Sequence, residues 1–418
     1  MLRGIKGVKD ILPDEIARWE VIEQTARGLS MSYGYQEIRV PLFEVTELFA
    51  RSIGASTDIV EKEMYTFQDR DGTSLTLRPE ATAGVVRAYI EHNLGGSATL
   101  QKFFYLGPMF RHERPQAGRL RQFHQYGVEY FGVSSPLADV EVISLLWRFL
   151  SALDLPDLSL QINSLGDAAD RQPYKAALLE FLKKREDRLC QNCRRRMETN
   201  PLRVLDCKVP GCQAATEDAP RIIDHLSAGS REHLQSVQAG LRELGIPFSV
   251  NSRLVRGLDY YTQTIFEVTA RGLGAQNAVA AGGRYDGLVE ALGGPKTSAV
   301  GFAVGLERVA LVLPASAIPR PQALIFVAAF GQRGLAAGTR VLDELRRLGL
   351  RADTDYRATT LKAHLRQADR LGAEYVVIVG DDEATRGRAV VRNMHTKSQE
   401  EFSLEIVPKT LKSRLKTG

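Results

Sequence analysis

The stretch FFYLGPMFRHERPQAGRLRQFHQYGVEYF, residues 103–131, decides the fold of this chain. Two apolar, aromatic-rich runs flank a charged segment, a layout that predicts a strand, a basic loop and a second strand. Guanidinium groups pair bidentately with phosphate oxygens, so the loop suits a polyphosphate or a nucleic-acid backbone. A solvated hairpin tip is the alternative. Acceptors among the arginines favour a ligand with anionic and cationic ends. The arginines are Arg111, Arg114, Arg119 and Arg121, and the acceptors are Glu113, Gln125 and Glu129.

The size and composition of the chain are those of an ordinary globular protein. Its 418 residues allow two or three domains of about 150 residues each. Hydrophobic residues make up 44% and charged residues 25%, a usual balance for soluble domains. No apolar run approaches the roughly 20 residues of a membrane helix, and the N-terminal MLRGIKGVKDILPDE lacks the apolar core of a signal peptide. We therefore expect a cytoplasmic protein with no membrane partner.

Positive charge is concentrated in the C-terminal part. The formal net charge is +5, and from Arg320 onward 18 Lys and Arg stand against 12 Asp and Glu. An excess of positive charge is what a surface tracking RNA phosphates needs. A basic domain without a nucleic-acid partner is the alternative.

The N-terminal part reads as alternating helices and strands. A helix is expected over residues 13–31, and YQEIRVPLFEV, residues 35–45, reads as one strand. Its Pro41 limits pairing on one side, which favours an edge or an interface. LTLRPE is expected as a short strand ending at Glu80, with a helix from Ala81. A helix over residues 137–153 and a strand in SLQINSLG follow.

The remaining chain changes character twice. Residues 167–245 are helical, charged and cysteine-containing, as expected of an insertion, and strands are expected around Gly257 and Gly272. After a helix at residues 305–313, the three prolines of residues 313–321 indicate a linker. Strands and helices then alternate up to a last strand near Ile406, which predicts an α/β unit with a largely parallel sheet.

The cysteines form one cluster in the sequence. CxxC followed by CxxxxC in a cytosolic protein favours zinc over disulfides, because cytosolic thiols stay reduced. The second spacing is loose, so a structural zinc site and four unligated thiols both remain open, and a catalytic role is not expected. The residues are Cys190, Cys193, Cys207 and Cys212.

Three stretches in order resemble one enzyme family. FRHERP followed by RQFHQ is similar to motif 2 of the class II aminoacyl-tRNA synthetases, in the form found in histidyl-tRNA synthetases. LVRGLDYYTQTIFEV, residues 254–268, resembles their histidine-specific signature, and AVGFAVGLERVALVL, residues 299–313, resembles motif 3. The resemblance runs from about Gly4 to Ile406. Residues 35–45 match motif 1, which implies a homodimer.

The resemblance implies a fold and a set of ligands. The implied fold is an α+β catalytic domain with a mainly antiparallel sheet flanked by helices, a helical insertion, and a C-terminal α/β anticodon-binding domain. The implied partners are L-histidine, ATP with Mg²⁺, and histidine tRNA. The three parts would occupy residues 1–166 with 246–315, residues 167–245, and residues 321–418.

The resemblance also assigns residues to ATP. Arg111 would hold the α-phosphate, and Arg119 and Arg308 the γ-phosphate. Phe123 would stack on adenine with Glu113 nearby. Each arginine could instead be a structural ion-pair partner. The same reading places Arg256 beside the reacting carboxylate and phosphate.

Other residues are assigned to histidine and to tRNA. Glu80, Thr82 and Gln125 would accept from the ammonium group, and Glu129 and Tyr261 would face the ring nitrogens. Tyr260 and Tyr261 could instead be core aromatics. At the tip of the motif 2 loop, the acceptor end of tRNA would meet Arg114 and Gln116. The glycines of AAGGRYDGL and GFAVGLER would shape the pocket floor or simply form turns.

The implied activity is the formation of histidyl-adenylate followed by transfer of histidine to tRNA. The main alternative is a non-catalytic, synthetase-like regulatory subunit of ATP phosphoribosyltransferase. Such proteins generally lack the C-terminal domain and the catalytic arginines, whereas this chain has both. A synthetase for proline or threonine would leave Glu129 and LVRGLDYY unexplained.

Overall fold

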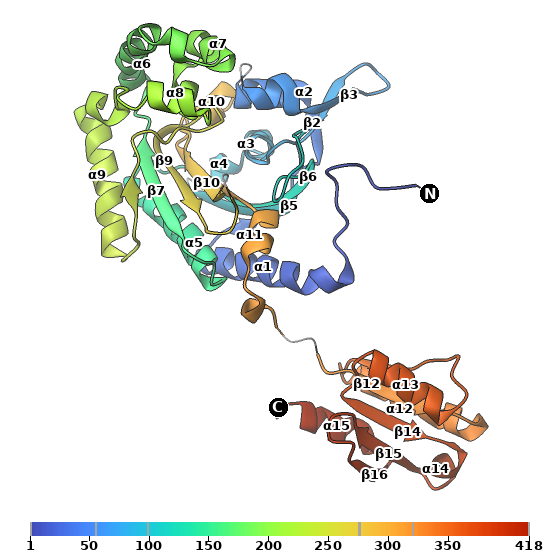
Figure 1. The fold of residues 1–418 in the computed structure, drawn as a ribbon. Helices are drawn as coiled ribbons and strands as arrows, with labels where there is room; N and C mark the ends of the chain where they lie inside the picture. The colour runs from blue at the N-terminus through green and yellow to red at the C-terminus, as the bar shows by residue number, and fades with distance from the viewer. Residues whose placement is uncertain (1, 55–56, 98–99, 275–276, 320–321, 417–418) are drawn as a thin grey trace. The chain divides into compact units, whose positions relative to one another are not determined.

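The computed structural model describes residues 2–54, 57–97, 100–274, 277–319 and 322–416. Within these ranges the chain divides into two compact units, Met1–Pro319 and Arg320–Gly418, each with its own apolar core (Figure 1). The expected linker holds a short 3-10 turn at Ala315–Ala317, and its residues 320–321 lie outside the described residues. In the described part of the chain, no helix has the length and apolar character needed to cross a membrane.

A large mixed sheet forms the centre of the first unit. Its strands run in the order β1-β5-β6-β11-β10-β9-β7-β8 among the described residues. Only the outer pairs β1/β5 and β7/β8 are parallel, which confirms the prediction of a mainly antiparallel sheet. The strands are β1 (Gln36–Glu37), β5 (Gln101–Phe110), β6 (Gln122–Phe131), β7 (Ser159–Ser164), β8 (Ser249–Val250), β9 (Thr262–Thr269), β10 (Ala278–Arg284) and β11 (Ala299–Gly305).

The β5–β6 hairpin confirms the predicted strand, loop and strand. Gln101 pairs with Phe131 at one end of the hairpin and Phe110 pairs with Gln122 at the other. The Arg111 N–H donates to the Arg121 carbonyl at 2.9 Å, which closes the neck of the loop. Most aromatic residues of the strands are buried, whereas Phe110 and Phe123, which lie near the basic loop, are half-buried.

A smaller sheet corrects the prediction of one strand over residues 35–45. The structure has two short strands there, β1 and β2 (Phe43–Val45), and they belong to different sheets. Pro41 lies between them and has no N–H to donate, which accounts for the break. Strand β2 pairs with β4 (Ser74–Leu77), which also pairs with β3 (Tyr65–Gln68).

Helices cover the central sheet. Helix α5 begins at Pro136 after Ser135, whose side chain accepts the Leu137 N–H, and most of the apolar residues in its interior are buried. Figure 1 shows α1 and α5 together on one side of the sheet. Helix α3 begins after Glu80 and α11 follows β11 directly. The bounds are α1 (Pro13–Ser32), α3 (Thr82–Glu91), α5 (Pro136–Ala152) and α11 (Leu306–Val312).

The inserted segment is helical, as expected. A capping box between Asp167 and Asp170 starts its first long helix. Figure 1 shows α6, α7 and α8 gathered at one end of the unit. The elements are α6 (Ala168–Lys183), η2 (Glu186–Arg188), α7 (Gln191–Thr199), η3 (Pro201–Val204), α8 (Pro210–Ala215), η4 (Ile222–His225) and α9 (Ala228–Glu243).

The strand expected around Gly257 is absent from the described residues. Strand β8 ends after Val250, because the Asn251 side chain turns back to accept the Arg253 N–H at 3.0 Å. LVRGLDY therefore forms an irregular loop that leads into β9 at Thr262. Gly272 lies in the turn after β9, where its φ of +99° suits glycine.

The second unit is α/β, but its sheet is less parallel than predicted. Its strand order in the described residues is β13-β12-β14-β15-β16. The pairs β12/β13 and β12/β14 are parallel and the others antiparallel, because the short connections after β14 and β15 cannot cross over. The bounds are β12 (Ile325–Ala329), β13 (Ala352–Asp353), β14 (Tyr375–Val379), β15 (Arg388–Asn393) and β16 (Gln399–Ser403).

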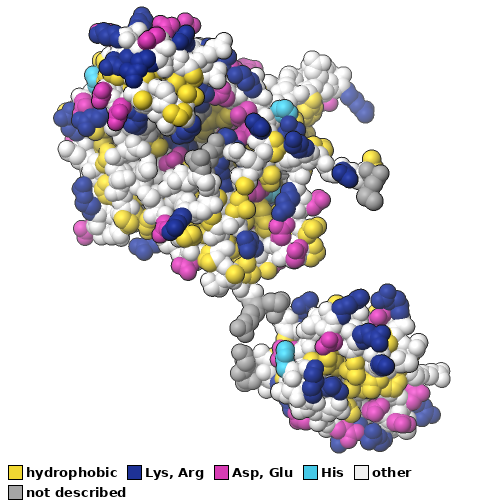
Figure 2. Space-filling model, in the orientation of Figure 1, with side chains coloured by type: hydrophobic (Ala, Val, Ile, Leu, Met, Phe, Trp, Pro, Cys, Tyr) yellow, Lys and Arg dark blue, Asp and Glu magenta, His cyan; other side chains and the backbone are white. Residues whose placement is uncertain are grey.

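Helices complete the second unit. The last strand, β16, ends at Ser403, slightly before the expected position near Ile406, and Ile406 itself precedes α15 (Val407–Lys416). Figure 2 shows Lys and Arg side chains spread over this unit. The other helices are α12 (Gln332–Arg347), α13 (Leu361–Arg370) and α14 (Asp381–Thr385).

A buried ion pair joins α5 to the end of β10. The guanidinium of Arg284 contacts the Asp139 carboxylate, and both side chains are at most 1% exposed. Burial alone would raise the pKa of Asp139, but His233 and the Arg284 charge outweigh burial, so the pKa falls below its usual value. Arg284 also donates to the Val133 carbonyl at 2.8 Å, so its charge is well satisfied.

Replacing Asp139 with Asn should therefore destabilise the first unit. The change removes the buried carboxylate and leaves Arg284 only the partly exposed Asp286 as a counter-charge, which should cost about 3 kcal/mol in the free energy of unfolding. Denaturant unfolding followed by tryptophan fluorescence measures this unit alone, because Trp19 and Trp147 both lie in it. Asp157→Asn, which removes the exposed pair with Arg271, is the control and should cost less than about 1 kcal/mol. Equal losses would contradict the assigned role of the buried pair.

Candidate active site

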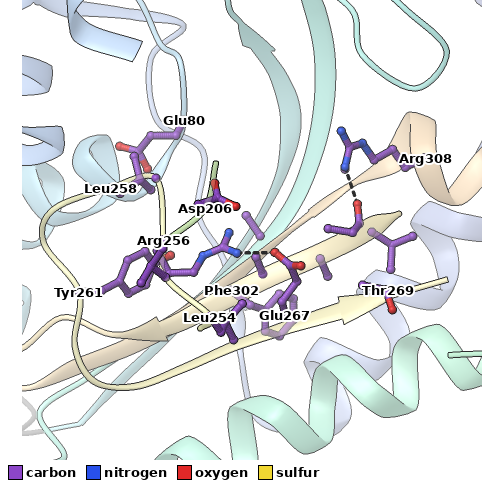
Figure 3. Close-up of a pocket in the computed structure, with 18 of the residues that line it drawn as sticks. Glu80, Asp206, Leu254, Arg256, Leu258, Tyr261, Glu267, Thr269, Phe302 and Arg308 are labelled. Carbon is purple, nitrogen blue, oxygen red and sulfur yellow. Dashed lines mark hydrogen bonds and ion pairs between the residues drawn. The ribbon is translucent and has the colours of Figure 1, made fainter. Parts of the chain in front are cut away.

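A cavity of about 660 Å³ opens on one face of the central sheet. Strands β6, β9, β10 and β11 contribute to its floor, and the loops at residues 111–121 and 251–261 contribute to its walls. Residues 205–208 of the inserted segment also line it. Figure 3 shows Glu80, Arg256, Glu267 and Arg308 around this space.

The hairpin loop brings an arginine and an aromatic ring together. Arg111 donates through Nε to the Pro79 carbonyl at 2.8 Å, and its guanidinium carbon lies 5.3 Å from the centroid of the Phe123 ring. Arg119 forms an ion pair with Glu113, whose side chain is almost buried. These contacts hold the guanidinium groups in place at the cavity wall.

Arg308 ties α11 to the same wall. Its Nε donates to the Gly118 carbonyl at 3.2 Å and its Nη1 to the Ala278 carbonyl at 2.5 Å. Burial lowers the pKa of Arg308, and the nearby charge of Arg119 lowers it further. Positive charges that repel one another and are partly desolvated favour a bound anion.

Arg256 projects from the irregular loop into the middle of the cavity (Figure 3). Its Nη1 lies 2.6 Å from Glu267 Oε2, and Glu267 belongs to β9. The Nε of Arg256 is buried and has no hydrogen-bond partner among the described residues. The ion pair thus fixes the direction of the guanidinium while donor capacity remains for a ligand.

Hydrogen-bond acceptors gather at the opposite end, where α3 begins. Glu80 accepts the Thr82 N–H at 2.6 Å and the Ala83 N–H at 2.9 Å. Burial raises the pKa of Glu80. The Oε1 atom of Gln125 is also buried and has no partner in the described part of the chain. An unpaired buried acceptor beside a cavity indicates a ligand that donates.

Glu129 is the most deeply buried of these acceptors. Thr82 donates to it at 2.7 Å, and Tyr285 donates to its other oxygen. Burial raises the pKa of Glu129 to about 8. A carboxyl group whose surroundings raise its pKa toward neutral pH is typical of a functional site.

Tyrosines enclose the space next to Glu129. The rings of Tyr260 and Tyr261 lie 4.7 Å apart between centroids, and the Tyr260 ring meets the Tyr285 ring edge-on at 5.5 Å. All three line the cavity. Their rings exclude water from the carboxylate, while their hydroxyl groups supply polar contacts.

Small residues form the floor beneath the acceptors. In the β6/β11 register Glu129 pairs with Gly301 and Gln125 pairs with Gly305. A Cβ atom at Gly301 would collide with the Glu129 carboxylate. The glycines expected either in the floor or in turns therefore lie largely in strands. Further small residues that line the cavity are Ala280, Ala281 and Ala303.

The structure brings most of the predicted site residues together, and their roles remain predictions. The residues assigned to histidine and ATP all line this one cavity: Glu80, Thr82, Arg111, Glu113, Arg119, Phe123, Gln125, Glu129, Arg256, Tyr260, Tyr261 and Arg308. Arg114 and Gln116 are exposed on the hairpin loop and do not line it, and of the cysteines only Cys207 does.

Sequence reasoning missed two residues of the site. Tyr285 stands in the quoted stretch AAGGRYDGL, where the glycines alone were considered. Glu267 stands in TQTIFEVT, and its pairing with Arg256 depends on how the preceding loop folds back. The first residue could have been found as an aromatic hydroxyl beside a glycine pair, whereas the second had no local signal.

Comparisons with known proteins agree with this architecture. The family model described as histidyl-tRNA synthetase matches residues 7–309, and one described as anticodon binding domain matches residues 324–414. The histidine–tRNA ligase of Desulfatibacillum aliphaticivorans is 52% identical over 97% of each chain. That of Geobacter metallireducens is 50% identical over 97% of this chain and 98% of its own.

Solved structures agree as well. The crystal structure of apo S. aureus histidyl-tRNA synthetase aligns with a TM-score of 0.82 at 37% identity, over 99% of this chain and 100% of that one. A structure described as an ATP phosphoribosyltransferase regulatory subunit/histidyl-tRNA synthetase from Bacillus halodurans C aligns with a TM-score of 0.67 at 21% identity. The alignment covers 91% of this chain and 98% of that one, and at this identity it shows a shared fold only. On the family match and the full-length relatives, the chain belongs to the histidyl-tRNA synthetase family.

Proposed function

We propose that this chain activates L-histidine with ATP and transfers the histidine to its tRNA. The observation that carries the proposal is the polarity of the cavity, with arginines at one end and buried acceptors at the other. ATP presents anionic phosphates, whereas histidine presents an ammonium group and ring N–H groups. The histidine–tRNA ligases at about 50% identity over nearly the whole chain support the same activity.

Activation needs positioning and positive charge more than acid–base chemistry. The histidine carboxylate is already a nucleophile and attacks the α-phosphorus while pyrophosphate leaves. Arg256 and Arg111 would reduce the repulsion between the histidine carboxylate and the α-phosphate, and they would stabilise negative charge on the phosphate oxygens. Mg²⁺ carried with ATP supplies further positive charge, and the cavity carboxylates Glu113 and Glu267 are the candidates to approach it.

The other residues at the arginine end of the cavity suit the γ-phosphate and the adenine of ATP. Arg119 and Arg308 would bind the γ-phosphate, and their converging charges favour an anion between them. Phe123 would stack on adenine on the ring face that Arg111 leaves open, with Glu113 nearby. Each of these roles rests on the family resemblance together with the shared cavity.

The acceptor side suits histidine. Glu80, Thr82 and Gln125 would bind the ammonium group, and the unpaired Gln125 Oε1 supports this. Glu129 and Tyr261 would face the two ring nitrogens, with Tyr260 packed beside them. Buried acceptors discriminate strongly, since an analogue without the matching donors leaves them unsatisfied.

Contacts with tRNA and with a second copy complete the proposal. Arg114 and Gln116 on the exposed hairpin loop would meet the acceptor end, and the basic second unit would bind the anticodon region. An enzyme that acts on tRNA would work in the cytoplasm. A homodimer through the region around β2 is supported by exposed apolar side chains there. These are Leu42, Phe43, Val45 and Phe67.

A regulatory subunit without catalysis is disfavoured. Such a role does not require arginines at the cavity or an anticodon-binding unit, and this chain has both. The Bacillus halodurans protein resembles this chain at a level that speaks for the fold alone.

The direct test is pyrophosphate exchange dependent on histidine. The intact protein should exchange pyrophosphate into ATP with histidine and with no other standard amino acid. Arg256→Ala should slow this exchange by roughly 100-fold or more, with histidine binding only moderately weaker, because the lost charge acts mainly on the transition state. Arg271→Ala is the matched control, since this arginine is exposed and does not line the cavity, and it should cost less than about tenfold. Near-normal exchange by the Arg256 variant would exclude a catalytic role.

Glu129→Gln should alter histidine recognition and its pH dependence. With a pKa of about 8, Glu129 is mostly protonated at pH 7 and gains the charge that attracts a ring N–H as pH rises. The Michaelis constant for histidine should therefore fall by about fivefold between pH 7 and 8 in the unchanged protein. The Gln variant should lack this slope and should show a raised constant for histidine with that for ATP little changed.

The same pH series in both proteins cancels the titration of histidine itself. A slope that persists in the Gln variant would assign the titration to another group. Equal damage to the constants for histidine and ATP would indicate a folding role for Glu129.

Removing residues 320–418 should separate activation from charging. The candidate cavity lies within the first unit, so histidine-dependent exchange should survive in part, whereas charging of tRNA should fall by roughly tenfold or more as phosphate contacts are lost. Tryptophan fluorescence checks that the first unit stays folded. Full charging by the shortened chain would refute tRNA binding by the second unit.

A further inference from the structure

The cysteines, dispersed over 23 positions of sequence, meet at one point of the inserted segment. The sulfur atoms of Cys190, Cys193, Cys207 and Cys212 all lie within 4.8 Å of one another. They come from the residue before α7, from α7, from the turn after η3, and from α8. These are all the cysteines of the chain, so every thiol it possesses is in this cluster.

The sulfur geometry fits a shared metal ion rather than disulfides. Cys190 Sγ and Cys207 Sγ are 4.0 Å apart, whereas a disulfide bond is about 2.05 Å long. Four sulfurs placed tetrahedrally around zinc at ~2.3 Å are about 3.8 Å from one another. The observed spacing therefore matches the edge of a metal–thiolate tetrahedron.

A backbone contact also fits bound thiolates. The Cys190 N–H donates to Cys212 Sγ at 3.1 Å. Hydrogen bonds to the ligating atoms orient ligands around a metal and stabilise their negative charge. Cys193 and Cys212 are at most 1% exposed, so a neutral cluster would pack four polar thiols against one another with little else to hold them.

The surroundings of the cysteines have little regular structure. Between α6 and α9 the chain has only short elements and contributes no strand in its described residues, and η3 and α8 span a few residues each. A metal or a disulfide would add to the stability that the buried apolar side chains of this segment supply. The free cysteines leave the metal as the cross-link.

We propose that these cysteines form a structural zinc site that fixes one wall of the active-site cavity. Four thiolate ligands close the coordination sphere, as in structural zinc sites, and leave no open position for substrate. The sequence spacing left zinc and free thiols equally open, and the convergence of the sulfurs decides between them.

The zinc site is adjacent to the candidate chemistry. Leu205, Asp206, Cys207 and Lys208 line the cavity, and Figure 3 shows Asp206 on the same space as Glu80 and Arg256. The segment between Cys193 and Cys207 also donates hydrogen bonds to the loop that carries Arg256. Arg203 donates to the Gly257 carbonyl at 2.8 Å, and Asn200 donates to Asp259 at 2.8 Å.

This connection gives the metal a positioning role. The chain between Cys193 and Cys207 carries both Asn200 and Arg203, so anchoring its two ends to one ion limits their movement. The Arg256 loop has little regular structure of its own, and these contacts are among those that hold it. Zinc would therefore hold the loop in place without touching a reacting atom.

The first test measures the metal in the full-length protein purified without added metal. Elemental analysis should find one zinc per chain, and titration of the thiols with a mercurial should release it as the four thiols react. Since all cysteines are in the cluster, the thiol signal reports on this site alone. Less than about a tenth of an equivalent of zinc, or iron in its place, would overturn the proposal.

Variants separate ligand loss from misfolding. Cys193→Ser and Cys207→Ser should lose the zinc, whereas Met197→Ala, which removes a buried side chain of the same segment, should retain it. Because a serine variant can fail to fold, the unchanged protein is also loaded with Co²⁺ after zinc removal. The visible absorption of tetrahedral cobalt bound to thiolates is expected. Spectra of octahedral cobalt would contradict a four-cysteine site.

The positioning role has a kinetic test, which rests on the proposed function. Removing zinc should weaken histidine-dependent exchange by about tenfold or more, and adding zinc back should restore it. Exchange within twofold of the starting rate after complete removal would overturn the positioning role. The metal content and the cobalt spectrum are measured without catalysis, so they test the zinc site independently of the histidine assignment.

Discussion

The alternation of side chains along β6 is the constraint on which the candidate site depends. Residues two apart on a strand share a face, so Phe123, Gln125 and Glu129 all point into the cavity. Pairing with β5 and β11 fixes this register, and a slip by one residue would turn all three away. The small residues of β11 opposite them follow from the same register, because a larger side chain at Gly301 would displace Glu129.

Buried charge is the second organising feature. Glu129 and Glu80 are removed from water, and burial raises the pKa of each. At the other end burial lowers the pKa of Arg308. In each case burial disfavours the charged form of the group, and a bound partner of opposite charge would offset that cost. A substrate with a cationic group and an anionic group can pair with the buried groups at both ends of the cavity at once.

Much of this arrangement could be predicted from local sequence, and the exceptions have physical causes. The β5–β6 hairpin was predicted because its two apolar runs and the basic loop between them are local features, whereas the cavity residues were assigned through the resemblance of the motifs to a known family. The single strand over residues 35–45 was wrong because Pro41 interrupts pairing, and the strand near Gly257 was wrong because the Asn251 side chain ends β8. Contacts such as Arg256 with Glu267 depend on chain folding far from either residue.

The inserted segment shows how a remote feature can act on the site. Its helices lie outside the sheet, yet residues 205–208 line the cavity and Arg203 donates to the loop that carries Arg256. That loop has no ladder of backbone hydrogen bonds, so its conformation must be imposed by neighbours. The sheet fixes Glu267, and the inserted segment fixes the other side of the loop. The loop that carries Arg256 is thus contacted both by the sheet and by the inserted segment.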